Sequence, residues 1–488
     1  MFVDRQAELA FLNSILERKR PTAAQFILLY GRRRVGKTVL LRHWAEGSGV
    51  PHIYWAAEKE PAALQRRKLY ARVLGVGTTQ APTFDSWADC WQAIAAFLRS
   101  TDSGAVAERR QILILDEFTY AVESDPAMLS SLQHAWDSSF KESQTILILC
   151  GSHVHTMETL QARQSPLFGR LTGQWWLHPL PFAALAEFLP TWSVEERVAA
   201  YAVVGGVPAY LEWLDPDRSL GDNIRDVIVA PGSMFVAEPT FLLYDEVREP
   251  GTHLAILKAI GAGNHTLAEI SDAALVSKAH LSAYLARLQE LRLVERRLPV
   301  TVPPERRRLA RSGRYHLSDP YFRFYFRFLT PYQDDLAYRP EQVLPRIREG
   351  LRAFVGMTAF EELARQWALE QGRAARLPFE IREVGSHWSR REQVDVVAIN
   401  WTDHAILLGE AKWGADPVGR SVIRELVGKA PGVLKELPGE GAGWQVHYAF
   451  FGRVGFTEAA RTEGESVGAQ LVDLERLDED LRSVPANP

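Results

Sequence analysis

The segment at residues 31–38, Gly-Arg-Arg-Arg-Val-Gly-Lys-Thr, constrains the fold of this chain more than any other part of its sequence. It matches the pattern G-x4-G-K-[ST], whose glycines permit backbone turns that aim N–H groups at phosphate oxygens. An apolar run at residues 26–30 precedes it, and a helical pattern begins at Lys37. Strand, loop and helix therefore follow in the order that a phosphate-binding loop requires, and the helix N-terminus adds its dipole.

The residue types of this loop predict individual roles. Lys37 is expected to reach the β- and γ-phosphates of a nucleotide, and the Thr38 hydroxyl is expected to bind Mg²⁺. The remaining expected nucleotide contacts in the loop and the helix are Gly31, Arg34, Gly36 and Val39. The predicted ligands of this site are thus a nucleoside triphosphate and Mg²⁺.

A second motif, at residues 112–117, places two carboxylates after a strand. Four apolar residues predict a buried strand, and Asp116 and Glu117 follow it directly. Ligands of parallel α/β sheets bind outside the carboxyl ends of the strands. We therefore expect Asp116 to hold Mg²⁺ and Glu117 to orient and deprotonate the attacking water.

Two further side chains are candidates for the same site. A third apolar run, at residues 145–150, ends just before Ser152, which could contact the γ-phosphate or the water as a sensor. Gly-Ser after a strand is also ordinary turn chemistry, so both interpretations stay open. Arg170 could supply positive charge to the transition state, or it could be a solvated loop arginine.

Together these motifs resemble the archaeal-type ATPase family, a branch of the AAA+/STAND-like P-loop proteins. The resemblance rests on residues 2–9 before the first strand, the Arg-rich loop, Leu-Asp-Glu-Phe at 115–118, and Gly-Ser followed by Leu-Phe-Gly-Arg at 167–170. Gly-Gly-Val-Pro at 205–208 follows downstream, and the resemblance covers roughly the first half of the chain. It implies that the nucleotide is ATP, that Arg5 lies near its base, and that residues 205–208 belong to a helical lid.

The region after residue 248 predicts a winged helix-turn-helix. Thr266 and Ser277 are expected to cap two successive helices, and residues 293–298 and 314–317 are expected to pair as strands around a wing. The second helix is expected to bury Leu281, Leu285 and Leu288 and to expose Lys278, His280, Ser282 and Arg287.

This region is locally basic. Residues 286–316 contain nine Arg and three Glu, a local balance of +6. A basic wing is typical of DNA binding, although winged helices also serve as protein-interaction and structural modules. The arginines that favour DNA as the partner are Arg306, Arg307, Arg308 and Arg311.

The C-terminal part predicts a cluster of carboxylates beside a lysine. Asp395 lies in a short strand, and Glu410 and Lys412 lie two residues apart in the next strand. Because side chains two residues apart share one face of a strand, neighbouring strands could gather all three at one point. The carboxylates would bind Mg²⁺, and the lysine would help to activate water or steady a pentavalent phosphorus. Glu361, on an upstream helix, is a further candidate ligand.

The spacing Asp-x14-Glu-x-Lys after a helix resembles the PD-(D/E)XK nuclease superfamily, although Val394 stands in place of the proline of that name. Residues 448–451 and 455–457 resemble the uncharacterised C-terminal domain often joined to these ATPases. This resemblance covers roughly residues 350–470 and implies a restriction-endonuclease-like fold. The same carboxylates and lysine could instead form a surface salt-bridge pattern, so a metal site and cleavage are separate hypotheses.

Composition excludes several other classes of protein. A net charge of −4 argues against a chain that is a polycation as a whole, and two cysteines exclude a disulfide framework and a Cys-rich zinc site. No apolar run approaches the roughly 20 residues that span a bilayer. We expect a cytoplasmic protein with DNA as a partner and no membrane partner, and the sequence leaves homo-oligomerisation on ATP binding open.

The predicted architecture is multidomain α/β. It has a P-loop parallel-sheet ATPase domain at residues 1–180, a helical lid at 181–248, a winged helix-turn-helix with an aromatic connector at 249–340, and a restriction-endonuclease-like α/β domain at 341–488. The predicted function couples Mg-ATP binding and hydrolysis to a DNA-directed winged helix and a metal-dependent nuclease-like domain. The alternative is a nucleotide-gated DNA-binding or scaffold switch, for example in defence, without nuclease activity.

Overall fold

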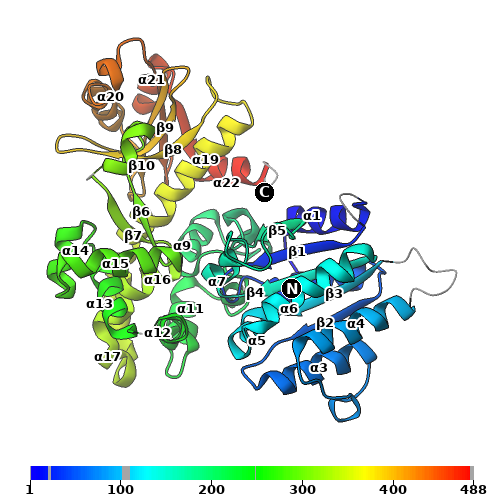
Figure 1. Ribbon diagram of the computed structural model, residues 1–488. Coiled ribbons are helices and arrows are strands. Elements are labelled where there is room, and N and C mark those ends of the chain that lie inside the picture. Colours follow the sequence, from blue (N-terminus) through cyan, green and yellow to red (C-terminus); the bar gives the residue numbers. More distant parts are fainter. Residues whose placement is uncertain (1, 20–22, 102–109, 248, 311, 484–488) are drawn as a thin grey trace. The chain divides into compact units, whose positions relative to one another are not determined.

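The computed structural model describes residues 2–19, 23–101, 110–247, 249–310 and 312–483 (Figure 1). Its chain divides into two compact units, one of Met1–Leu180 with Val207–Ala209 and one of Pro181–Gly206 with Tyr210–Asn487. The domain boundaries at residues 180, 248 and 340 stay predictions. The segments predicted as a lid, a winged helix-turn-helix and a nuclease-like domain lie in the second unit, apart from residues 207–209.

The first unit is built on a five-stranded sheet in the order β2-β3-β4-β1-β5. The strands are β1 (Gln25–Tyr30), β2 (His52–Ala56), β3 (Gln111–Asp116), β4 (Thr145–Gly151) and β5 (Gly173–Trp176). Every neighbouring pair is parallel, so the carboxyl ends of all strands lie at one edge. The predicted parallel sheet is therefore confirmed. Because β4 lies between β1 and β3, the residues after β4 lie between the phosphate loop and Asp116.

Side chains are buried on both faces of this sheet. Phe26 and Leu28 of β1 belong to one core, which α4 (Trp87–Thr101) and α6 (Ala127–Ser138) help to build. Ile27 and Leu29 belong to a second core, which is completed by residues of α1 (Gln6–Glu17) and α2 (Lys37–Gly47). Since successive strand residues point to opposite faces, one uninterrupted apolar run fills both cores.

The second unit begins with helices and an aromatic connector. Its first long helices are α9 (Val194–Val204) and α12 (Met234–Glu246), and the connector begins with α16 (Pro320–Phe324). The buried rings of the connector are Tyr321, Phe322, Phe324, Tyr325, Phe326 and Phe328. The segment expected to form an aromatic connector is therefore buried.

Three helices and a hairpin follow one another in the region whose sequence pattern predicts a winged helix-turn-helix. They are α13 (Pro250–Gly261), α14 (Leu267–Ala274), α15 (Lys278–Glu290) and the antiparallel strands β6 (Val294–Arg297) and β7 (Arg314–Leu317). Thr266 caps α14 as expected, by accepting a hydrogen bond from Glu269 N. Ser277 occupies the N-cap position of α15 as expected, but its hydroxyl makes no capping bond to the backbone and lies 3.2 Å from His280 Nδ1.

A second five-stranded sheet, in the order β12-β11-β10-β9-β8, forms the C-terminal part of this unit. Its strands are β8 (Glu383–Trp388), β9 (Gln393–Asn400), β10 (Ala405–Lys412), β11 (Gln445–Gly452) and β12 (Gln470–Asp473). The first three strands are antiparallel, and β10, β11 and β12 are parallel. The helices around it are α18 (Val343–Val355), α19 (Glu361–Arg373), α20 (Arg420–Leu434), α21 (Glu458–Ser466) and α22 (Leu474–Ser483).

Both faces of this mixed sheet are covered. Ile406 and Leu408 of β10 share a core with Ile423 of α20, and Trp367 of α19 packs edge-on against Phe451 at a centroid distance of 5.4 Å. Within the described ranges, no helix combines the length and the apolar character that a membrane crossing demands.

Candidate functional site

The two glycines of the phosphate loop serve different physical purposes. Gly36, directly before α2, has a φ of 93°, a conformation that residues with a side chain rarely adopt. Gly31 has no such backbone requirement, but a Cβ at this position would lie 2.3 Å from the Leu177 carbonyl oxygen. Arg34 also has a positive φ, 69°, which is unusual for a non-glycine residue and marks a strained loop. Only the second glycine therefore supports the expected backbone turn directly.

Lys37 lies buried across this loop. Its Nζ donates hydrogen bonds to the carbonyl oxygens of Gly31 (2.8 Å) and Arg32 (2.9 Å). Burial lowers the pKa of Lys37, and the carboxylates of Asp116 and Glu117 oppose that effect. The ammonium thus sits where the loop curls, as a phosphate-binding lysine requires.

Asp116 is fixed by three hydrogen bonds. Thr38 Oγ1 (2.6 Å) and Tyr54 OH (2.5 Å) both donate to Oδ2, and the Glu117 N–H donates to Oδ1 at 2.9 Å. Burial alone would raise the pKa of Asp116, but the hydrogen bonds from Thr38 and Tyr54 outweigh it and lower the pKa. An ionised carboxylate beside a hydroxyl is an oxygen donor set that suits Mg²⁺.

Tyr54 is a residue of this site that the sequence motifs do not mark. It lies in β2, whose register pairs Tyr54 with Ile114 and Ala56 with Asp116. The guanidinium of Arg42 lies 4.3 Å from the centre of its ring. Only knowledge of the strand order and register would have identified Tyr54, because no local pattern links it to Asp116.

Glu117 is oriented by Ser152. It directly precedes α5 (Phe118–Ser124) with a φ of 47°, and its Oε1 accepts a hydrogen bond of 2.9 Å from Ser152 Oγ. Its Oε2 is buried and has no hydrogen-bond partner within the described parts of the chain. Ser152 thus contacts Glu117, and in this conformation it is a positioning residue for that carboxylate.

Arg5, Val39 and Arg170 differ in how closely they approach this cluster. Arg5 is buried and donates from Nη2 to the Val35 carbonyl oxygen at 2.9 Å, so it braces the loop backbone. The Val39 side chain is 55% exposed at the start of α2. The Arg170 guanidinium is engaged elsewhere, because it pairs with Asp137 of α6 (2.7 Å) and binds two carbonyl oxygens of its own loop. The structure therefore does not join Arg170 to the residues around Lys37.

The predicted C-terminal residues line one pocket of about 660 Å³. Glu361 reaches it from the first turn of α19, Asp395 from β9, and Glu410 and Lys412 from β10. The antiparallel register pairs Val396 with Gly409, so Asp395 and Glu410 are brought together from adjacent strands. The Ala411 N–H donates to Asp395 Oδ2 at 3.2 Å.

Burial and mutual repulsion perturb these carboxylates. Burial, followed by the charge of Asp395, raises the pKa of Glu361 to about 7, and burial followed by Glu410 raises the pKa of Asp395. Lys412 Nζ lies 2.6 Å from Glu410 Oε1, and Lys429 of α20 lies 3.8 Å from Oε2. Burial lowers the pKa of Lys412, but the hydrogen bond to Glu410 outweighs it and raises the pKa.

A three-carboxylate metal site is not preformed here. Among the residues that the structure describes, no three His, Cys, Asp or Glu side chains gather closely enough to hold a metal ion. The expected ligand set of Glu361, Asp395 and Glu410 therefore needs correction, since two lysines contact Glu410 and Arg365 contacts Glu361. Asp395 and Glu410 alone still fit Mg²⁺, which proteins often hold through one or two carboxylates, and Glu410 Oε2 is buried without a hydrogen-bond donor.

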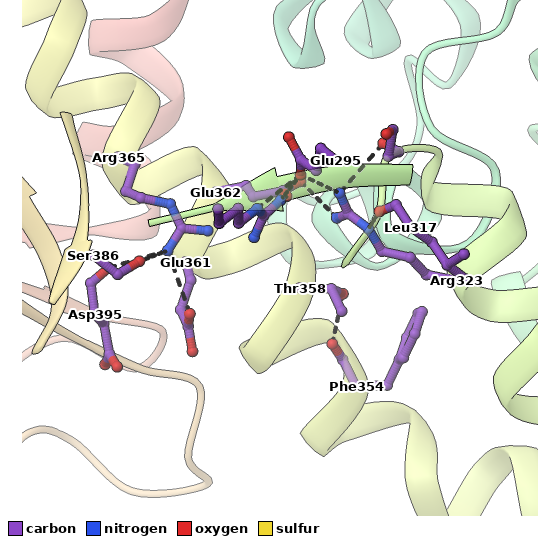
Figure 2. Close-up of polar contacts among 12 residues, drawn as sticks. Glu295, Leu317, Arg323, Phe354, Thr358, Glu361, Glu362, Arg365, Ser386 and Asp395 are labelled. Carbon is purple, nitrogen blue, oxygen red and sulfur yellow. Dashed lines mark hydrogen bonds and ion pairs between the residues drawn. The ribbon is translucent and has the colours of Figure 1, made fainter. Parts of the chain in front are cut away.

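Arg365 ties the first turn of α19 to the sheet. Figure 2 shows its guanidinium directed toward Ser386, Asp395 and Glu361. The distances are 3.2 Å to Ser386 Oγ, 3.0 Å to the Asp395 carbonyl oxygen and 3.4 Å to Glu361 Oε2. Arg365 is a second residue that the sequence motifs do not mark, although it lies one helical turn after Glu361.

The loop between β6 and β7 lies along β8. The Val300 N–H donates to the Ser386 carbonyl oxygen at 3.0 Å, and Thr301 Oγ1 lies 2.8 Å from His387 Nδ1. Arg307 forms an ion pair with Glu383. Of the arginines expected to contact DNA, Arg306 and Arg308 are exposed, Arg307 is engaged by Glu383, and Arg311 lies outside the described residues.

Comparison with known proteins gives two family matches. Residues 2–214 match an ATPase domain found predominantly in Archaea, and residues 325–422 match a family of archaeal and bacterial proteins of unknown function. The chain is 34% identical over 416 residues to the uncharacterized protein MJECL04 of Methanocaldococcus jannaschii, a match that covers 85% of this chain and 88% of that protein. It is also 49% identical over 51 residues to the uncharacterized ATP-binding protein MJ0423 of the same organism, or 10% of this chain and 80% of that protein.

Solved structures with some similarity include the Walker-type ATPase PABY2304 of Pyrococcus abyssi. Its TM-score is 0.49 at 19% identity, over 67% of this chain and 96% of that one. The ORC2 protein of Aeropyrum pernix, in its ADPNP–ADP complexes, gives a TM-score of 0.44 at 15% identity, over 71% and 95% of the two chains.

Proposed function

We propose, from the premise that the chain belongs to the family of MJECL04 and carries an archaeal-type ATPase domain, that it is a Mg²⁺-dependent ATPase whose nucleotide cycle controls a nucleic-acid-directed C-terminal part. One observation carries this proposal. Thr38, Asp116, Glu117 and Ser152 are joined by hydrogen bonds at the carboxyl edge of one parallel sheet, beside Lys37.

Each residue at this edge of the sheet has its own role in the proposed reaction. Lys37 binds the β- and γ-phosphates, and Thr38 and Asp116 hold Mg²⁺, which neutralises charge on the phosphates when it is bound. Glu117 accepts a proton from the attacking water through its free Oε2, while Ser152 fixes the carboxylate through Oε1. Arg5 braces the loop through the Val35 carbonyl oxygen.

Replacement of Lys37 by alanine tests the nucleotide site. We expect Lys37→Ala to lose ATP binding or turnover, because the variant lacks the buried ammonium that would bind the phosphates at this loop. Lys68→Ala is a matched control, since Lys68 forms an exposed pair with Glu58 and a partly buried pair with Glu60 in the same unit. Unchanged ATP turnover in Lys37→Ala would overturn the proposal.

A second candidate activity is metal-dependent cleavage of a phosphodiester at the C-terminal pocket. It is supported by Asp395, Glu410 and Lys412 lining one pocket of about 660 Å³, with Glu361 beside them. Asp395 and Glu410 would hold Mg²⁺, and Lys412 would steady the phosphorus or help to activate water. The exposed arginines of the β6–β7 loop and the outer face of α15 would bind DNA as a winged helix.

The alternative is a nucleotide-gated DNA-binding or scaffold switch that does not cleave. Lys412 and Lys429 both contact Glu410, which supports an ion-pair cluster in place of a catalytic metal. The two are distinguished by incubating plasmid and single-stranded DNA with Mg²⁺ or Mn²⁺, with and without ATP. Cleavage that is lost in Asp395→Ala supports the nuclease, and absence of cleavage with intact ATPase activity supports the switch.

A further inference from the structure

The turn between β8 and β9 presents two arginines on a braced backbone. Ser389 N donates to the Glu392 carbonyl oxygen at 2.8 Å, and Ser389 Oγ accepts from the N–H groups of Arg391 (3.2 Å) and Glu392 (3.1 Å). Arg390 and Arg391 are both exposed, and within the described part of the chain neither guanidinium forms an ion pair or a hydrogen bond. The serine therefore fixes the tip of the turn while both cations stay available to a partner.

One side of this turn leads into the C-terminal pocket. β9 starts at Gln393, directly after the turn, and Gln393 lines the pocket together with Asp395. Arg352 of α18 also lines the pocket, is exposed, and has no ion pair among the described residues. The pocket thus carries a cation, Arg352, beside the carboxylates of Glu349 and Asp395.

The other side of the turn leads to the basic loop between β6 and β7. Trp388, the cross-strand partner of Gln393, donates from Nε1 to the Ser312 carbonyl oxygen at 3.0 Å. The guanidinium of Arg314 lies 4.9 Å from the centre of the Trp388 ring. The loop that exposes Arg306 and Arg308 is therefore anchored next to the turn, and both belong to the second unit.

We propose that Arg390 and Arg391 form a phosphate-binding surface that holds a nucleic-acid backbone between the β6–β7 loop and the C-terminal pocket. This inference rests on the proposed nucleic-acid-directed function and adds the path that the strand follows. Arginine binds phosphate through its planar fork of N–H donors, and successive phosphates need cations at successive positions. The β6–β7 loop supplies cations next to Trp388, and Arg352 supplies one in the pocket that Gln393 lines. The arginines of the β8–β9 turn lie between these two cross-strand partners in the sequence.

The test measures binding of a fluorescein-labelled DNA, single-stranded and duplex, to the full chain in the presence of ATP and across a range of salt. The variants are Arg390→Gln/Arg391→Gln and Arg306→Gln/Arg308→Gln, with Arg373→Gln/Arg461→Gln as a control of equal charge change at exposed helical positions. Each lost phosphate contact lowers the slope of log K against log salt by about 0.9 for duplex and about 0.7 for single strands.

We expect the Arg390/Arg391 variant to bind at least one of the two DNAs about tenfold or more weakly, with a slope smaller by about 1.4 to 1.8, while the control stays unchanged. Affinity and slope that match wild type, with binding still weakened by the Arg306/Arg308 change, would overturn this surface and leave the proposed function standing. Absence of salt-dependent DNA binding in wild type would overturn both. Displacement of the DNA by poly-glutamate at equal charge would show an acidic-protein surface and would also overturn the inference.

Discussion

At the scale of single residues, the nucleotide site depends on which oxygen each donor reaches. Thr38 and Tyr54 share Oδ2 of Asp116, whereas the backbone N–H of Glu117 holds Oδ1. If Thr38 and Asp116 held Mg²⁺, the Tyr54 hydroxyl would orient the carboxylate of Asp116. Such an outer partner fixes the geometry of a metal ligand without touching the metal.

Tyr54→Phe therefore should weaken Mg²⁺ binding while it preserves the ring. Loss of an outer-sphere hydrogen bond typically costs about 10- to 100-fold in metal affinity. The measurement is the Mg²⁺ concentration that half-saturates nucleotide binding, followed with a fluorescent ATP analogue. Tyr70→Phe is the control, because Tyr70 packs edge-on against Phe84 at 5.0 Å in the same unit. A Tyr54→Phe half-saturation within twofold of wild type would contradict this role.

At the scale of elements, the hairpin and α19 are joined by a network of ion pairs. Glu362 binds Arg297 of β6 at 2.7 Å and Arg323 of α16 at 2.8 Å. Figure 2 shows Glu362 and Arg323 in the same view as Arg365. Burial alone would raise the pKa of Glu362. The positive charge of Arg323, followed by the charges of Arg297 and Arg365, outweighs burial and lowers the pKa to about 2. The adjacent Glu361 lines the pocket, so one helical turn serves both the hairpin and the pocket.

Glu362→Gln should destabilise this region. The change leaves Arg297 and Arg323 without their shared carboxylate. Because the Glu362 side chain is 26% exposed, the cost should lie between that of an exposed pair, below about 1 kcal/mol, and that of a buried pair, about 3 to 5 kcal/mol. We expect the free energy of unfolding, measured with urea, to fall by about 2 kcal/mol. Glu380→Gln is the matched control, because Glu380 and Arg382 form an exposed pair. A loss no larger than in the control would show that the network contributes little.

His316 should make the stability of the hairpin depend on pH. Burial, followed by Arg297 and His265, lowers the pKa of His316 to about 2, and His265 stacks on it at 4.3 Å. Below about pH 6.5 the unfolded chain therefore binds a proton that the folded chain does not, and stability falls as pH falls.

The expected loss is about 1.4 kcal/mol per pH unit for each such histidine. Urea unfolding of wild type and His316→Gln at about pH 7.5 and about pH 5.5 measures it. The variant should lose less stability on acidification than wild type. Equal pH dependence of the two proteins would show that His316 is charged in the folded state.

At the scale of the whole molecule, sequence patterns reveal what is local and miss what register and packing bring together. The phosphate loop, Asp116 and Glu117 are predictable because each follows a continuous apolar strand that fills two cores. Tyr54 and Arg365 are not predictable in this way, because each contacts an aspartate on a different element. Tyr54 reaches Asp116 through the pairing of β2 with β3, and Arg365 of α19 reaches the Asp395 carbonyl oxygen in β9. Arg170 is predicted from its position in a motif, but it forms an ion pair with Asp137 of α6.

The C-terminal part shows the same limit at larger scale. The alternation of β10 correctly places Glu410 and Lys412 on one face. The ion pair of Glu410 with Lys429 is not visible in the pattern, because it depends on how α20 packs on the sheet. The docking of the β6–β7 loop on β8 likewise depends on tertiary contacts such as Thr301 with His387.

The most direct test of the central claim is ATP turnover by Glu117→Gln, with nucleotide affinity measured in parallel. The substituted amide would keep the size of the side chain and could still accept from Ser152, but it cannot take a proton from water, a step worth about 10²- to 10⁴-fold in rate. The account predicts a fall in turnover of that size with ATP affinity within about twofold of wild type. Turnover that matches wild type would contradict the assignment of Glu117 as the base and with it the proposed ATPase mechanism.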